Sequence, residues 1–154
     1  MISMAKRTDI INAMKTRFQA IKVTGGYQTN LGSNVSVWRT SSYQPQELPA
    51  LNIRDIKDDI VDVTQGAAHR MPSLHSMTVE LDITVANKTA TIETVRKCLE
   101  DVEAAIVTDE YWSGKALRTM EEKNEITIAQ DEDTISGMMI TLRIDYRTEK
   151  FKPN

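Results

Sequence analysis

Two segments of strictly alternating sequence constrain the fold more than any other feature of this chain. Apolar residues occupy every second position of residues 77–85, and threonine or acidic residues lie between them. Residues 138–147 alternate in the same way. Successive side chains of a strand point to opposite faces of a sheet, so each segment predicts a strand with one buried and one polar face. The chain must therefore build a sheet whose apolar face is covered.

Two amphipathic segments can supply that cover. Residues 8–22 and 91–107 place apolar side chains three and four positions apart, which is typical of helices with one apolar face. Shorter alternating stretches predict further strands at 35–39, 51–56 and 116–128. The elements that cover the sheet thus precede and follow several strands.

The order helix, strands, helix, strands predicts an α+β fold with a largely antiparallel or mixed β-sheet and both amphipathic helices packed on one face. A length of 154 residues suits one domain, and no repeat or linker divides it, so we expect a single domain over residues 1–154. Charged runs predict a turn at 57–59, a break at 121–124 and a connecting turn at 131–133.

Charge and cysteine content narrow the class of protein. Nineteen Lys and Arg residues stand against 22 Asp and Glu residues, a net charge of −3, which argues against a dedicated nucleic-acid binder. The single cysteine, Cys98, cannot form an intramolecular disulfide, and we expect it to be a small packing residue. The first residues lack the apolar segment of a secretory signal, and no apolar run is long enough to span a membrane.

The sequence offers no readable catalytic, cofactor or metal site. His69 and His75 are the only imidazoles, and too few other ligands accompany them to hold zinc. Neither a phosphate-binding glycine loop nor a Gly-x-Ser-x-Gly elbow occurs. We therefore predict a protein that is not an enzyme and that has no cofactor or metal, although a site built from scattered carboxylates stays open.

Several aromatic residues lie in otherwise polar sequence. They are Trp38, Tyr43, Tyr111 and Trp112. Such residues either join the core or anchor protein–protein contacts, and for Tyr43 and Trp112 both interpretations stay open.

Features along most of the chain carry a resemblance to a known family. They are the N-terminal amphipathic helix, ELPALNI at 47–53, HSMTVEL at 75–81, the second helix ending in DEYW at 109–112, and IDYRT at 144–148. Together they resemble the tail terminator (tail completion) proteins of long-tailed bacteriophages. The resemblance implies a structural virion assembly protein that caps the tail tube as a ring, a homohexamer.

This resemblance also implies partners and a location. The ring would stop polymerisation of the tail tube protein and offer its other side to head-completion or connector proteins, for head-to-tail joining. DNA would only pass through the lumen, and no membrane would be involved. The protein would lie at the neck end of the tail in the virion, and in the host cytoplasm during assembly.

Two hypotheses concern residues of such a ring. The residues predicted to contact a neighbouring subunit are Trp38, Tyr43, Tyr111, Trp112 and Arg118. Those predicted to line the lumen and repel passing DNA are Asp58, Asp59, Asp131 and Asp133.

Other interpretations remain open at this stage. The nearest is another neck, connector or minor tail protein. A bacterial ligand-binding α+β domain would need a deep apolar pocket, to which nothing in the sequence points. A hydrolase or transferase would need a nucleophile and a base that the sequence does not pair.

Overall fold

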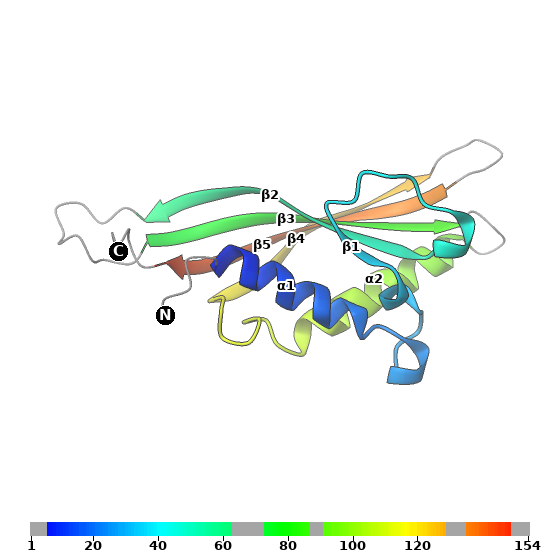
Figure 1. Ribbon diagram of the computed structural model, residues 1–154, viewed down its shortest axis with the longest axis horizontal. Helices are drawn as coiled ribbons and strands as arrows, with labels where there is room; N and C mark the ends of the chain where they lie inside the picture. Colours follow the sequence, from blue (N-terminus) through cyan, green and yellow to red (C-terminus); the bar gives the residue numbers. More distant parts are fainter. Residues whose placement is uncertain (1–5, 63–72, 87–90, 129–134, 149–154) are drawn as a thin grey trace.

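A computed structural model describes residues 6–62, 73–86, 91–128 and 135–148. Its longer elements, in chain order, are α1 (Lys6–Gln19), β1 (Val35–Val37), β2 (Ala50–Asp62), β3 (Ser73–Ala86), α2 (Thr91–Val107), β4 (Arg118–Ile128) and β5 (Ile135–Thr148). Within the described residues the strands form one five-stranded sheet in the order β1-β2-β3-β5-β4 (Figure 1). Among the described strand pairs, only β1–β2 is parallel. The predicted α+β fold with a mixed sheet is confirmed.

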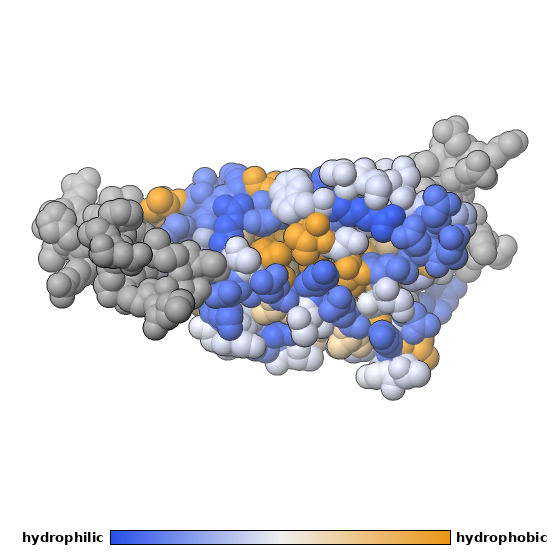
Figure 2. Space-filling model, viewed as in Figure 1, coloured by the Kyte–Doolittle hydropathy of each residue, from blue (hydrophilic) through white to orange (hydrophobic). Residues whose placement is uncertain are grey.

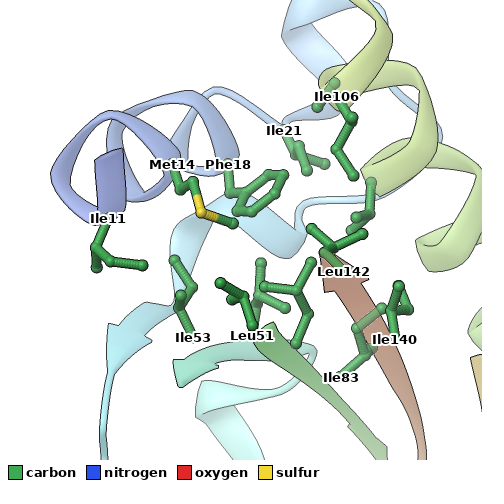
Figure 3. Packing of buried hydrophobic residues seen from close by; sticks show 14 of the residues in the cluster. Ile11, Met14, Phe18, Ile21, Leu51, Ile53, Ile83, Ile106, Ile140 and Leu142 are labelled. Atoms are coloured by element: carbon green, nitrogen blue, oxygen red, sulfur yellow. The ribbon is translucent and has the colours of Figure 1, made fainter. Parts of the chain in front are cut away.

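Both helices lie on the same face of the sheet (Figure 1). α2 contacts β3 and β5, and α1 contacts β1 and β2. Figure 3 shows the apolar side chains of α1 pointing onto those of the strands, with Phe18 of α1 above Leu51 and Leu142. The alternating apolar residues of β3 and β5 are all buried on this face. Each such side chain stabilises the fold by about 1.5–3 kcal/mol when it leaves water.

Two of the expected interruptions are wrong, because the strands run through them. β2 continues over 57–59, and its register with β3 shifts between Asp55 and Lys57. β4 continues over 121–124, with a register shift between Glu121 and Lys123. In each case a β-bulge takes up one extra residue, so the charged run stays in the sheet instead of ending the strand. The segment 131–133 lies outside the described residues.

The bulge in β2 decides which side chains face the helices. Asp55 pairs with Val79, and Asp58 pairs with Met77, so both carboxylates lie on the helix-covered face although three positions separate them. Without the extra residue, positions of unlike parity would point to opposite faces. Asp58 is therefore brought to the same face as Asp55.

The other face of the sheet is covered by neither α1 nor α2, and we call it the helix-free face. The segment 38–49 lies over one end of it (Figure 1). There the side chain of Asn52 pairs with both backbone groups of Arg39: Arg39 N donates to Asn52 Oδ1 over 2.9 Å, and Asn52 Nδ2 donates to Arg39 O over 3.0 Å. Charged side chains that pair across the strands, such as Arg54 with Glu80 and Asp82, occupy more of this face.

Candidate functional site

One long side of β2 has no strand beside it for half its length. β1 pairs only with Leu51–Ile53, so no described strand covers the outer side of residues 56–62. Three large apolar side chains lie at or beside this stretch: Trp38, Ile56 and Ile60 are 49%, 43% and 57% exposed. We call Trp38 and residues 56–60 the β2 edge. Figure 2 shows further apolar surface between α1 and the strands, over β1, flanked by hydrophilic residues.

Trp38 is held rigidly at the start of the β2 edge. Its backbone lies in the left-handed region, at φ 53°, which an L-residue with a large side chain rarely adopts. Its indole N–H donates to Asp55 Oδ1 over 2.7 Å, and the other carboxylate oxygen of Asp55 accepts from Arg7 Nε over 2.6 Å. Strained residues persist where surrounding contacts hold them, and they cluster at functional sites. Trp38 therefore has the properties of a preorganised contact residue.

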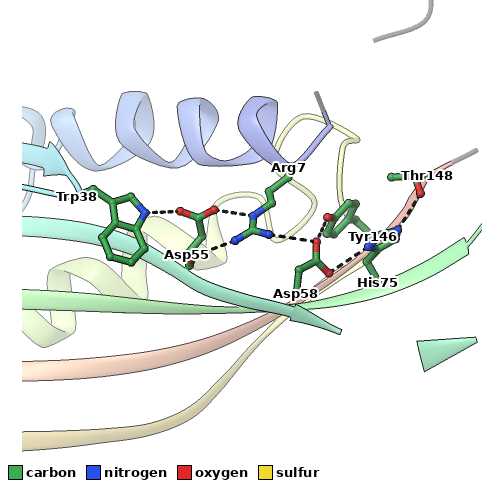
Figure 4. A network of polar contacts seen from close by, with 7 residues as sticks. All are labelled: Arg7, Trp38, Asp55, Asp58, His75, Tyr146 and Thr148. Atoms are coloured by element: carbon green, nitrogen blue, oxygen red, sulfur yellow. Dashed lines mark hydrogen bonds and ion pairs between the residues drawn. The ribbon is translucent and has the colours of Figure 1, made fainter. Parts of the chain in front are cut away.

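A network of polar side chains continues from Asp55 along the helix-covered face (Figure 4). Asp58 lies 3.8 Å from Arg7 Nη1 and 3.1 Å from His75 Nδ1, and it accepts a hydrogen bond from the Tyr146 hydroxyl. His75 Nε2 lies 2.8 Å from Thr148 Oγ1, and the imidazole stacks on the Tyr146 ring. The network thus joins α1, β2, β3 and β5 near the end of the sheet.

The order Asp58, His75, Thr148 is that of an acid, an imidazole and a hydroxyl in nucleophilic catalysis. The sequence did not reveal it, because 90 residues separate Asp58 from Thr148 in the chain and only the antiparallel pairing of β2, β3 and β5 aligns them. Asp58 is also occupied by Arg7 and Tyr146, and neither of the two hollows described below includes any of these residues. These contacts connect α1, β2, β3 and β5.

Four further exposed apolar side chains occur between the end of α2 and the end of β4. Val107 ends α2, Tyr111 and Leu117 lie in the connection to β4, and Ile126 lies on β4 itself. They are 71%, 54%, 45% and 41% exposed, and we call these four residues and β4 the β4 edge. β4 pairs with β5 on one side and with no described strand on the other.

The connection before β4 is held by one carboxylate. Asp109 Oδ1 accepts from Tyr111 N over 2.9 Å, and Asp109 Oδ2 accepts from Ser113 N over 2.8 Å and from Arg17 Nη2 over 3.2 Å. The two backbone N–H bonds are the leading cause that lowers the pKa of Asp109. They also fix Trp112 and Ser113 at φ 50° and 60°. Tyr111 is thereby presented on a rigid turn.

Trp112 was one of the residues predicted to contact a neighbouring subunit, but its side chain does not reach the surface. Its side chain is fully buried, with the ring edge-to-face against Phe18 at 5.9 Å between centroids. The Arg17 guanidinium lies 4.2 Å from the ring centroid, and the indole N–H donates to Thr119 Oγ1 over 2.7 Å. The sequence allowed Trp112 to be either a core residue or a contact residue, and in the structure it is part of the core.

The other predicted contact residues have intermediate positions. Tyr43 is half-buried under the Arg39 guanidinium, 4.2 Å from its ring centroid, on the helix-free face. Arg118 is exposed and bonds to Asp145 Oδ2 over 2.6 Å. Trp38 and Tyr111 remain the two predicted aromatic residues with the largest free surface.

Of the acidic residues predicted to line a lumen, Asp58 and Asp59 have different surroundings in the structure. Asp58 is largely buried in the polar network, where Arg7 balances its charge, whereas Asp59 is exposed beside Lys57 at 3.2 Å. The two point to opposite faces, since Asp58 pairs with Met77 and Asp59 with Ser76. They cannot line one surface together. Asp131 and Asp133 lie outside the described residues.

Two shallow hollows occur among the described residues. One, of about 550 Å³, lies beside α1 and includes Arg17 and Lys115, and the other, of about 310 Å³, lies between Tyr43 and Asp82 on the helix-free face.

Burial raises the pKa of the Cys98 thiol to about 11, so this side chain is an unreactive core residue at neutral pH.

Within the described ranges, no three His, Cys, Asp or Glu side chains come together as ligands of a metal ion. No helix of the described chain has both the length and the apolar character that crossing a membrane requires.

Comparison with known proteins adds no relative to this description. No protein-family model matches the chain, and no curated protein matches it significantly. Function must therefore be argued from the surfaces described above.

Proposed function

We propose that this chain is a structural subunit that assembles with copies of itself into a closed ring, like the phage tail terminator proteins that its sequence resembles. In this role it caps the tail tube, stops its polymerisation and offers a surface to the proteins that join head and tail. It would act without catalysis or a cofactor, in the virion and, during assembly, in the host cytoplasm.

The observation that carries the proposal is the placement of exposed apolar side chains. Among the described residues, every large exposed apolar side chain except Val23 lies at the β2 edge or the β4 edge. β2 and β4 lie toward opposite sides of one sheet and differ in sequence. Two unlike patches on opposite sides suit a head-to-tail contact, which generates rings when the rotation between copies closes.

The alternatives fit the same surfaces less well. A ligand-binding domain would have a deep apolar pocket, and the hollows described above are shallow and partly polar. A hydrolase built on Asp58, His75 and Thr148 would need an accessible cleft and donors for an oxyanion. A neck or connector component would share the ring and differ in its place in the virion.

Two measurements test the proposal. The first is the solution mass of the protein over a range of concentrations, together with electron microscopy of any rings. The second is tail length in a phage that lacks a working copy of this chain. Overlong tail tubes are the expected result. Tails of normal length without heads would indicate a connector instead, and normal virions would refute an assembly role.

A further inference from the structure

We propose that neighbouring copies join by adding β4 of one copy to the β2 edge of the next, with Lys57 opposite Glu125 and Asp59 opposite Lys123. This inference rests on the proposed function in one respect: the partner is a second copy of the chain. It goes further in naming the strands, their direction and their register.

The direction of the strands permits such an addition. β2, β3, β5 and β4 are antiparallel to their neighbours in turn, so β2 and β4 run in opposite directions at opposite sides of the sheet. A second copy placed alongside in the same orientation therefore brings its β4 antiparallel to β2. Exposed strand sides of this kind offer unpaired N–H and C=O groups to another chain.

The backbone groups also alternate in the required way. Leu51 N donates outward to Asn34 O, and Ile53 O accepts from Trp38 N, so the helix-face residues of β2 direct their backbone groups away from β3. After the bulge, Asp58 and Ile60 take over this role. Paired residues alternate between bonded and non-bonded across an antiparallel sheet, so helix-face residues of β4 also direct their groups outward.

Charge selects one register. Lys57 and Asp59 are exposed on the helix-free face of β2, and Lys123 and Glu125 are exposed on the same face of β4. The proposed register sets each lysine opposite a carboxylate. A shift by two residues would set Lys57 opposite Lys123 in one direction, or Asp59 opposite Glu125 in the other. Unlike charges directly opposite stabilise a strand pair, and like charges destabilise it.

The same register joins apolar side chains on the other face. It places Ile56 opposite Ile126, both of which are exposed in the single chain. Ile126 lies on the helix-covered face because it pairs with Met138, and Ile56 sits at the bulge beside Asp55, which lies on that face too. Charged pairs on one face and an isoleucine pair on the other thus arise from a single alignment.

Disulfide trapping tests the register in the full chain. Lys57→Cys and Glu125→Cys form a non-bonded pair in this alignment, in which Cα atoms lie about 4.5 Å apart, close enough for a disulfide. Mixing the two variants should give a covalent dimer, which neither variant forms alone. Lys57→Cys mixed with Lys123→Cys is the matched control and should not link. Cys98 stays silent because it is buried.

Charge exchange tests the same contact without a covalent bond. Lys57→Glu alone, or Glu125→Lys alone, should weaken self-association about tenfold, because one attractive pair becomes repulsive. The two changes together should restore it. Lys97→Glu, on the exposed surface of α2, makes the same change in charge and should leave association unaltered.

The outcomes separate this inference from the proposed function. Rings that assemble while positions 57 and 125 fail to link would overturn the contact and leave the ring intact as a function. A link between Lys123→Cys and Glu125→Cys chains would overturn it in favour of a two-fold pair of β4 strands. Chains that stay monomeric and unlinked at every concentration would also overturn it, and tail length would then decide the function separately.

Discussion

Trp38 and Trp112 share a backbone conformation and a kind of hydrogen bond, but they differ in what covers them. Both lie in the left-handed region, at φ 53° and 50°, and both donate the indole N–H over 2.7 Å, to Asp55 and to Thr119. Trp112 is fully buried, whereas about half of Trp38 is exposed. Trp38 directly follows β1, and Trp112 lies in the connection before β4, which are the first and last strands in the order of the sheet.

The same left-handed backbone conformation therefore occurs in a buried tryptophan and in an exposed one. At Trp112, burial against Phe18 and Arg17 offsets the strain, and the ring supports the turn that presents Tyr111. At Trp38, β1 has just ended, so little buried area offsets the strain and the polar contacts of Asp55 hold the ring. Strain kept without burial is better explained by a contact made outside the single chain.

The largest expected effect is the loss of the buried indole. Trp112→Ala should lower the free energy of unfolding by about 3–5 kcal/mol, since it leaves a cavity under Arg17 and removes the N–H that donates to Thr119 Oγ1. Urea denaturation followed by far-ultraviolet circular dichroism measures this. Trp38→Ala is the matched control, and equal losses at the two positions would erase the distinction drawn between them.

The turn that holds Trp112 should come next in size. Asp109→Ala removes the carboxylate that accepts from the Ser113 and Tyr111 N–H groups and from Arg17 Nη2, and should lower the free energy of unfolding. Because the folded state lowers the pKa of Asp109, its contribution is present at neutral pH and disappears as the pH falls through that lowered pKa. In thermal unfolding, the Tm difference between wild type and variant should therefore be larger at pH 7 than in acid.

A smaller change in stability, but a change in assembly, is expected at the exposed tryptophan. Trp38→Ala loses one hydrogen bond to Asp55, worth about 1 kcal/mol of unfolding free energy. As an aromatic anchor at the β2 edge it should weaken self-association about tenfold. Analytical ultracentrifugation measures the association. Unchanged association with reduced stability would make Trp38 a structural residue like Trp112.

Periodicity predicted the parts of the molecule that depend on burial. The alternation of 77–85 and 138–147 and the helical spacing of 91–107 gave β3, β5 and α2, because each of these elements must hide one apolar face. The charged runs at 57–59 and 121–124 predict interruptions, but β2 and β4 continue through them. A strand at the edge of a sheet can expose charged side chains to water, so a charged run need not end it.

The two edges were only partly visible in the sequence. Trp38 and Tyr111 stood out as aromatics in polar surroundings, but the same signal also selected Trp112, which Phe18 and Arg17 cover from a distant part of the chain. The bulge that turns Asp58 toward Arg7 depends on pairing with β3, so no local pattern marks it. The Asp58–His75 contact was hidden for the same reason.

Carboxylates extend the comparison of the two sides of the sheet. At the β2 edge, burial alone would raise the pKa of Asp55, but hydrogen bonds from Trp38 and Arg7 lower it. Near the β4 edge, Glu103 of α2 faces Glu121 of β4 without such a cation. Burial, the hydrogen bond with Glu121 and the nearby negative charges raise the pKa of Glu103 to about 7. The contribution of Asp55 to stability is therefore lost in acid, whereas the unfavourable effect of Glu103 is relieved there.

Glu103→Gln gives the smallest effect and shows it only at one end of the pH range. Between the unfolded pKa of about 4.3 and the folded value of about 7, native Glu103 keeps a proton that the unfolded chain has released, so stability falls as the pH rises. The variant lacks this proton release, and its Tm should exceed that of the wild type at pH 8 and match it at pH 4. Glu93→Gln is the control: it removes the ion pair with Lys97 near the start of α2 and should not raise the Tm at pH 8. Equal Tm differences at both pH values would mean that Glu103 and Glu121 do not share a proton in the folded chain.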